Sequence, residues 1–182
     1  MPSELILALE QHIGKVEARR YSLAEIADVE RCLGFSLPTL LVDFYRQIGP
    51  GLFGPGTGFM IDLFGDRGVD FYLEIRIGNP DEPAWSWPVG VLPICDWGCN
   101  NYTCVDCLTP PNPVLTYEPV DGPIARSFAK TRDSLERWFR DWSAGVDLYD
   151  TLYEPAPELD RVGKNPKTGE PIVLKARKPK HR

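Results

Sequence analysis

One segment, Trp87–Cys107, constrains the fold more than any other part of the chain, and its sequence is WPVGVLPICDWGCNNYTCVDC. Apolar residues continue up to Ile94 and resume at Tyr102, after a run of turn-forming residues at Asp96–Asn101. Two apolar stretches on either side of a polar turn are typical of a buried β-hairpin with a long loop. The segment therefore predicts a central antiparallel strand pair.

Amphipathic helices are predicted on both sides of this hairpin in the sequence. Ser22 and Glu25 have the spacing of a capping box, and Gly34 supplies a left-handed residue at which a helix can end. Pro38 is tolerated in the first turn of a helix that begins at Ser36. The predicted helices are Ser3–Ile13, Ser22–Leu33, Ser36–Ile48 and a final helix with the apolar face Leu135, Trp138, Phe139 and Trp142.

Further strands are predicted around the hairpin. The apolar residues of Val69–Ile77 recur at a strict period of two, which favours a strand. Phe59–Phe64 and Pro113–Tyr117 are also predicted strands, whereas Gly51–Gly58 is too rich in Gly and Pro for anything but a turn. Helices, then strands, then a helix predict an α+β domain. We expect a largely antiparallel sheet of about five to six strands, with helices at its N-terminal and C-terminal ends.

Charge divides the chain into an acidic body and a basic tail. Residues 161–182 hold eight Lys and Arg residues against one Glu, a net charge of +7. Since the whole chain carries −6, residues 1–160 carry −13. We predict one domain at 1–150, a Pro-rich linker at 151–160 and a flexible basic tail at 161–182. An acidic body attracts a basic partner and repels nucleic acid, and the tail does the reverse.

The N-terminal sequence and the number of cysteines predict the cellular location and the redox state of the protein. The N-terminus does not resemble a signal peptide, and no apolar run approaches the length of a membrane span. We therefore expect a cytoplasmic protein that does not bind membranes and keeps its five cysteines reduced.

Four cysteines, Cys95, Cys99, Cys104 and Cys107, lie in the hairpin segment and raise the question of a zinc site. Their C-x3-C-x4-C-x2-C spacing is too compressed for a tetrahedral structural site, which usually pairs two knuckles about a dozen or more residues apart. Free cysteine is also among the most buried residue types. We predict buried structural thiols, with no metal and no cofactor.

Catalytic candidates are few. His12 is the only histidine in the predicted domain, because His181 lies in the tail. The sequence has no nucleophile elbow, Walker loop or dinucleotide fingerprint. The Gly-rich run Gly51–Gly58 is not followed by the Lys-Ser/Thr pair of a phosphate-binding loop. The protein is predicted not to be an enzyme.

The hairpin segment, together with Leu33–Pro38 (LGFSLP) and the Gly-rich run after Gly49, resembles the SUKH superfamily over about residues 22–148. That superfamily includes bacterial immunity proteins against polymorphic toxins and eukaryotic regulators of cell-wall glucan synthesis. The resemblance implies a binding protein, and specifically an immunity protein that occludes a cognate toxin domain, often a nuclease.

Acidic side chains in and beside the predicted strands are the candidate partner-binding residues. For any single acid, a solvated surface residue is the simpler interpretation, but the summed charge of the body is large enough to speed association with a basic partner about 10-fold or more. Trp85 and Trp87 are of a residue type common in interfaces and equally common in cores. The candidates are Asp62, Asp66, Asp70, Asp81, Glu82, Trp85 and Asp96, with Asp106 as a further exposed acid.

The tail has a second resemblance, in which Gly163–Leu174 is similar to the descending half of the DNA-clasping arm of HU/IHF histone-like proteins. In that family the proline of the Asn-Pro pair wedges between base steps in the minor groove. The resemblance implies weak DNA binding through Lys164, Asn165, Pro166 and Lys167. The alternative function is therefore a nucleoid-associated or DNA-tethered regulator. A disordered tail that solvates itself or folds back on the acidic body is the simpler interpretation.

Overall fold

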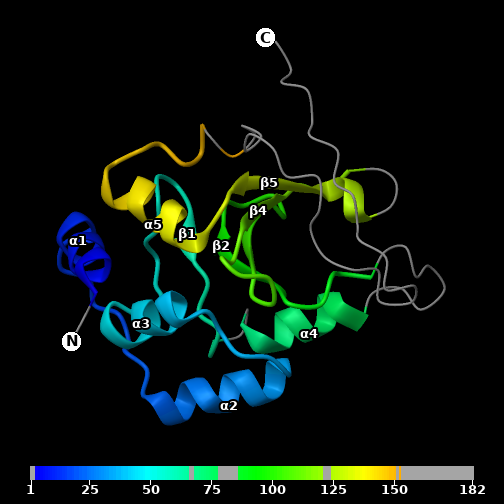
Figure 1. Cartoon of the computed structure of the whole chain (residues 1–182), viewed down its shortest axis with the longest axis horizontal. Coiled ribbons are helices and arrows are strands. Elements are labelled where there is room, and N and C mark those ends of the chain that lie inside the picture. Colours follow the sequence, from blue (N-terminus) through cyan, green and yellow to red (C-terminus); the bar gives the residue numbers. More distant parts are fainter. Residues whose placement is uncertain (1–2, 66–67, 78–85, 121–123, 151, 153–182) are drawn as a thin grey trace.

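In the part of the chain that the structure describes, five antiparallel strands form one sheet, and they follow one another in chain order from β1 to β5. The computed structural model describes residues 3–65, 68–77, 86–120, 124–150 and 152 (Figure 1). The strands are β1 (Phe59–Met60), β2 (Val91–Asp96), β3 (Tyr102–Asp106), β4 (Val114–Tyr117) and β5 (Phe128–Arg132). The predicted α+β fold with an antiparallel sheet is confirmed.

The predicted central hairpin is formed by β2 and β3. Val91 pairs with Asp106 at one end and Asp96 with Tyr102 at the other, and the register shifts between Pro93 and Cys95. Every residue of β3 is buried, so both faces of this strand are covered. Strands buried on both faces are rich in apolar residues, and β2 and β3 follow this tendency, with the buried Thr103 and Asp106 as polar exceptions in β3.

Five α-helices surround the sheet in the described residues. In Figure 1, α4 lies beneath the open side of the curved sheet, whereas α1, α3 and α5 group beside β1 and β2. The bounds are α1 (Glu4–Ile13), α2 (Leu23–Leu33), α3 (Thr39–Gln47), α4 (Val69–Ile77) and α5 (Leu135–Ser143), with a short 3-10 helix, η2 (Ile124–Ser127), before β5.

Local signals set the ends of α2. The Ser22 hydroxyl accepts a hydrogen bond from the Glu25 N–H at 3.3 Å, and the Glu25 carboxylate accepts one from the Ser22 N–H at 2.8 Å. Gly34 ends the helix with a φ of 79°. Glu30, the one polar residue in the apolar stripe, accepts the Leu37 N–H at 2.7 Å and so ties the helix to the segment that follows. The predicted capping box and glycine stop are confirmed.

The start of α3 differs from the prediction. Ser36 does not begin the helix, because Pro38 is the N-cap residue and the helix starts at Thr39. The amides of Leu41 and Val42 both donate to the Pro38 carbonyl, at 2.8 and 3.0 Å. Proline thus stands just before the first turn instead of inside it.

The prediction of a strand at Val69–Ile77 was wrong, because this segment is α4. In the helix only Tyr72 is fully buried, while Leu73 and Ile77 remain exposed. The Tyr72 hydroxyl accepts the Gly90 N–H at 3.0 Å, and Arg76 donates to the Trp87 carbonyl at 2.6 Å. These contacts with the segment before β2 favour a helix, and tertiary packing overrides the period-two pattern.

Two strand boundaries also differ from the predictions. The predicted strand Phe59–Phe64 is shortened to β1, because Asp62 turns the chain by accepting the Phe64 N–H at 3.0 Å. A strand at Phe128–Arg132 was not predicted, because FAKTR contains too few apolar residues to suggest one.

The two edges of the sheet are β1 and β5. β1 is only two residues long. β5 carries Lys130, whose side chain is 7% exposed and forms an ion pair with Asp133 at 2.9 Å. Short edge strands and an inward-pointing lysine are two devices that keep sheets from pairing with other chains.

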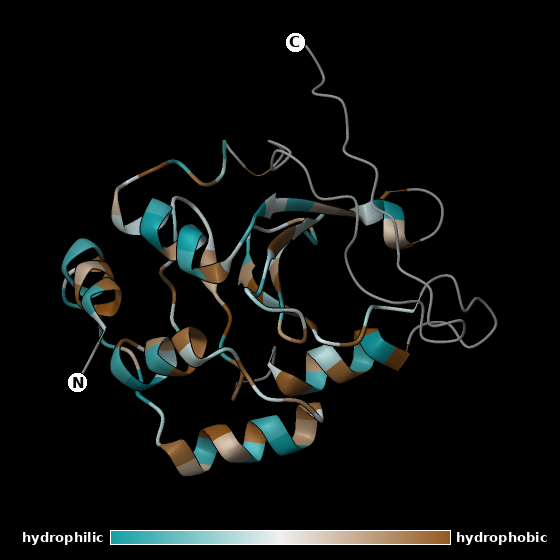
Figure 2. Cartoon of the chain, in the orientation of Figure 1, coloured by the Kyte–Doolittle hydropathy of each residue, from teal (hydrophilic) through white to brown (hydrophobic). Residues whose placement is uncertain are grey.

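The final helix, α5, packs as the sequence predicts. Figure 2 shows its mixed hydrophilic and hydrophobic surface, and Ser134 caps it by accepting the Arg137 N–H at 3.1 Å. Its buried apolar residues are Leu135, Trp138, Phe139 and Trp142, and the Phe139 ring stacks on Phe44 of α3 at 5.4 Å. Within the described residues, no helix combines the length and apolar character needed to cross a membrane.

Candidate binding surface

The tip of the β2–β3 hairpin is a tight turn with an unusual backbone. Gly98, Cys99 and Asn100 all have positive φ, at 81°, 52° and 60°. The Asn101 N–H donates to the Gly98 carbonyl at 2.9 Å, and the Gly98 N–H donates to Asp96 Oδ1 at 2.7 Å. Left-handed backbone at non-glycine residues is energetically unfavourable and is found disproportionately at functional sites.

Trp97 lies beside this tip in a fixed orientation. Its indole N–H donates to Thr103 Oγ1 at 2.8 Å. Its ring covers Gly58 so closely that a Cβ at that glycine would lie 3.0 Å from the ring and 2.6 Å from Cys95 Sγ. The Gly-rich turn therefore holds a glycine at position 58, because Cys95 and Trp97 occupy the space of a side chain.

The segment after α5 completes an aromatic pair with this tryptophan. The Tyr149 ring lies 5.7 Å from the Trp97 ring, and Tyr149 is 49% exposed. Asp147 accepts the Tyr149 N–H at 2.9 Å and the Asp150 N–H at 3.3 Å. We call Trp97, Asp147, Tyr149 and Asp150 the corner surface.

Acidic and apolar groups border the corner surface. A Cβ at Gly56 would lie 4.0 Å from Asp147 Oδ1, which places the Gly-rich turn beside the carboxylate. Asp96 pairs with Phe59 in the β1–β2 register, and Phe59 is 48% exposed. Leu52 is 92% exposed next to β1. Aromatic side chains with acidic neighbours suit recognition of a basic protein, because the rings supply buried area and the acids supply charge complementarity.

The predicted acids that the structure describes have separate surroundings. Asp62 is half-buried and accepts hydrogen bonds from the Tyr21 hydroxyl at 2.8 Å and from the Phe64 N–H. Burial, followed by this hydrogen bond to Asp62, raises the pKa of Tyr21 above its ordinary value. Asp96 pairs with Phe59 at the start of β1, whereas Asp62 lies two residues beyond the end of that strand.

The remaining predicted acids have different surroundings. Asp70 is exposed in the first turn of α4, where a carboxylate is stabilised by the helix dipole. The expectation that Asp106 is exposed was wrong, because it is buried and accepts the N–H groups of Leu108 and Thr109 at 3.0 and 3.2 Å. Outside the described residues lie Asp66, Asp81, Glu82 and Trp85, and the tail residues Lys164, Asn165, Pro166 and Lys167.

Trp97, Tyr149, Asp147 and Asp150 were not among the predicted binding residues. Trp97 stands inside the turn-forming run of the hairpin, and an aromatic residue in an otherwise polar turn was a usable signal. Tyr149 follows the glycine that ends the final helix, and its position in the sequence gives no sign of the contact with Trp97. Trp87, in contrast, is a core residue that donates to the Val91 carbonyl at 2.6 Å.

The hairpin thiols are mostly buried. Cys95 and Cys104 are fully buried and Cys107 is partly covered, whereas Cys99 is exposed at the turn. Burial raises the pKa of Cys95, Cys104 and Cys107 above that of a free thiol. Protonated thiols are poor nucleophiles and poor metal ligands. Among the residues that the structure places, no three His, Cys, Asp or Glu side chains gather as a metal site would require.

Elemental analysis of the purified protein is expected to find far less than one equivalent of zinc or iron, because the buried thiols are held in the protonated form. The measurement should be repeated on a Cys104→Ala variant, which removes the central buried thiol. One tightly held equivalent in the parent protein, lost together with folding on chelation, would overturn this prediction.

The comparisons with known proteins give one match. The model of the SMI1 / KNR4 family (SUKH-1) matches residues 21–141, which is more than half of the chain. No curated protein matches the sequence. No solved structure matches it either.

Proposed function

The chain belongs to the SMI1 / KNR4 family (SUKH-1), and on this basis we propose that it is a non-catalytic immunity protein that binds a basic protein toxin and neutralises it. Membership of this family is consistent with binding to a protein partner in general. Its toxin is proposed to be a nuclease, because a nuclease cleft that binds nucleic acid is basic and an acidic protein can fill it.

The observation that carries the proposal is the corner surface. Trp97 is held by its hydrogen bond to Thr103, so it is an aromatic anchor that needs little ordering on binding. The Tyr149 ring packs against it at an interplanar angle of 55° and remains half-exposed. Asp147 and Asp150 add negative charge in the same short segment as Tyr149, where Asp147 accepts the N–H groups of Tyr149 and Asp150. A few aromatic residues usually supply most of the energy of a protein interface, and the surrounding charges set the rate.

The predicted partner-binding set is revised accordingly. Asp96 stays in the proposed contact region, because it directly precedes Trp97 and accepts the Gly98 N–H at the hairpin tip. Asp70, in the first turn of α4, is proposed to add to the negative charge that attracts the partner. Asp62 is assigned a structural role through Tyr21 and Phe64. The loop residues Asp66, Asp81, Glu82 and Trp85 remain predicted contributors to binding.

The proposal is tested with a candidate toxin domain, which is to be sought among the reading frames next to the gene of this protein. Replacement of Tyr149 by Ala is expected to raise the Kd about 30-fold, the effect of losing about 2 kcal/mol at an interface hot spot. The exposed position of Tyr149 means that the variant should unfold at an unchanged denaturant concentration. Leu23→Ala is the matched control, because Leu23 is 58% exposed on α2 and its loss should leave the Kd unchanged.

The same complex tests the electrostatic part of the proposal. The double variant Asp147→Asn/Asp150→Asn removes two charges and keeps one side-chain oxygen at each position, which can still accept the backbone N–H groups at residue 147, so it should slow association while leaving folding intact. The association rate of the parent protein should fall about 10-fold or more as salt rises from low to high. An association rate that does not depend on salt would contradict the electrostatic part of the proposal. Unchanged affinity in Tyr149→Ala would place the interface elsewhere.

A further inference from the structure

The described part of the chain ends at the corner surface. Leu148 and Leu152 are buried, and the Leu152 N–H donates to the Tyr149 carbonyl at 3.2 Å. This turn is thereby fixed to the core, while the side chains of Tyr149 and Asp150 on it are exposed. All residues that follow Leu152 are therefore tethered within one turn of the corner surface.

The corner surface offers two kinds of contact to a cationic segment. Asp147 and Asp150 are exposed and form no ion pair with any cation that the structure describes. The Tyr149 ring, in the same turn, is 49% exposed. A guanidinium or ammonium group is attracted by a carboxylate and also by the face of an aromatic ring. A segment with several cations can use these groups separately, so the two carboxylates need not share one cation.

The chain itself contains a cationic segment within reach. Residues 153–160 hold three acidic residues and residues 161–167 hold three Lys and Arg residues, so these two stretches have no net charge together. Residues 175–182 hold five Lys and Arg residues and no acidic residue. This run begins 23 residues beyond Leu152, and such a stretch spans at most about 80 Å when fully extended. The run is therefore long enough in its tether to return to the corner surface.

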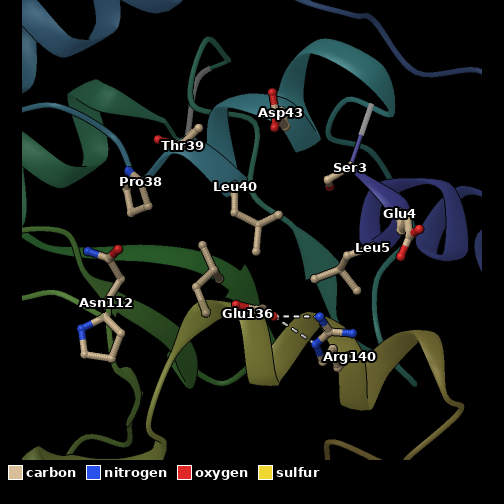
Figure 3. Close-up of a pocket in the computed structure, with 12 residues that line it drawn as sticks. Ser3, Glu4, Leu5, Pro38, Thr39, Leu40, Asp43, Asn112, Glu136 and Arg140 are labelled. Atoms are coloured by element: carbon tan, nitrogen blue, oxygen red, sulfur yellow. Dashed lines mark hydrogen bonds and ion pairs between the residues drawn. The ribbon is translucent and has the colours of Figure 1, made fainter. Parts of the chain in front are cut away.

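A groove elsewhere on the fold is less suited to this run. It has a volume of about 610 Å³ and lies between the beginnings of α1, α3 and α5 (Figure 3). Helix N-termini carry a partial positive charge, which disfavours a cation. Arg140 in the lining is a further cation, paired with Glu136, and the other two carboxylates, Glu4 and Asp43, lie apart (Figure 3). Charge therefore favours the corner surface over this groove.

We propose that residues 175–182 dock on the corner surface of their own chain and compete there with a basic partner. Lys and Arg side chains pair one each with Asp147 and Asp150, and an Arg guanidinium stacks on the exposed Tyr149 ring. Each such contact is weak at an exposed surface. The tether compensates, because it raises the effective concentration of the run to the order of 1 mM. A partner must displace the run, which lowers the apparent affinity of the partner for the corner surface.

The competition rests on the proposed function, whereas the docking of the run does not. Docking is measured on the isolated protein, so its failure is distinct from a failure to bind a toxin domain. With a toxin domain in hand, removal of the run's charges is expected to lower the Kd about twofold to threefold, the effect of a competitor that covers the surface about half to two-thirds of the time. An unchanged or higher Kd would overturn the competition.

The docking test uses the full chain, labelled with ¹⁵N and held at low salt. The triple variant Lys175→Gln/Arg177→Gln/Lys178→Gln is expected to move the indole N–H signal of Trp97 and the amide signal of Tyr149. Raising the salt concentration should move the same two signals of the parent protein in the same direction, because salt screens exposed ion pairs.

Two sets of variants provide matched comparisons. Arg161→Gln/Lys164→Gln/Lys167→Gln removes the same number of cations from the other basic stretch and should move the two signals less than half as far. Asp147→Asn/Asp150→Asn should reduce the salt-dependent shift of the Trp97 indole signal by at least half.

The comparison for the acidic pair is on α4. Asp70→Asn/Glu74→Gln removes two exposed carboxylates from that helix and should leave the salt-dependent shift of the Trp97 indole signal unchanged. Unmoved corner signals in the first triple variant, or equal shifts in both triple variants, would overturn the docking. A shift of the α4 amide signals in place of the corner signals would place the run on that helix and would also overturn it.

Discussion

Replacement of Trp138 by Ala is expected to lower the free energy of unfolding by about 3–5 kcal/mol, the range for removing a fully buried aromatic side chain. Trp138 is 2% exposed, and its ring packs against Phe139 and Trp142 at 5.5 and 5.7 Å. The loss is a large share of the roughly 5–15 kcal/mol that stabilises a typical domain. Urea denaturation followed by fluorescence or circular dichroism measures it.

A surface variant and a contrary outcome make the Trp138 experiment decisive. Leu23→Ala removes a side chain that is 58% exposed, so it should change the free energy of unfolding by no more than about 0.5 kcal/mol. A Trp138→Ala protein that melts like the parent and has lost a binding partner would show that the apolar face of α5 is an interface and not part of the core.

Replacement of Asp141 by Ala is expected to lower the free energy of unfolding by about 3 kcal/mol. Asp141 accepts a hydrogen bond from Arg132 Nε at 2.6 Å and forms an ion pair with Arg137 Nε at 2.9 Å, and its side chain is 11% exposed. Arg132 is 14% exposed, so the variant leaves a mostly buried guanidinium without its carboxylate. Breaking a buried pair from one side costs about 3–5 kcal/mol, and the residual exposure places this pair at the low end.

The exposed pair on the same helix is the control for Asp141. Glu136 and Arg140 are 59% and 61% exposed, with an i,i+4 spacing, and Glu136→Ala should cost about 0.5 kcal/mol or less. Equal losses for Glu136→Ala and Asp141→Ala would mean that solvent screens the Arg132 pair as fully as a surface pair. The double variant Arg132→Met/Asp141→Leu should recover part of the lost stability, because no charge is then left buried.

The parts of the fold that were predicted from the sequence are those with local causes. The capping box of Ser22 and Glu25 and the stop at Gly34 act within a few residues, and the structure contains them as predicted. The hairpin of β2 and β3 was predictable because two stretches rich in apolar residues flank a run of turn-forming residues. The spacing of the apolar residues of α5 likewise matches a helix with one buried face.

The parts that were missed depend on contacts between distant segments. Val69–Ile77 alternates like a strand, but the hydrogen bonds of Tyr72 and Arg76 with the segment before β2 exist only in the folded chain. Trp97 and Tyr149 meet because the segment after α5 returns to the hairpin tip. Asp106 looked like a surface acid, and its true role depends on the turn between β3 and β4. No local pattern encodes such contacts.

The protected sheet edges have a consequence for how this protein can change over evolutionary time. A partner that added a strand to the sheet would bind mainly through hydrogen bonds to the backbone. The specificity of such binding is difficult to change by substituting side chains. With a two-residue strand at one edge and a buried lysine at the other, recognition is left to side chains on turns and helix ends. Such positions tolerate replacement with little effect on folding. A lineage could therefore exchange one partner for another through a few surface substitutions and keep the same scaffold.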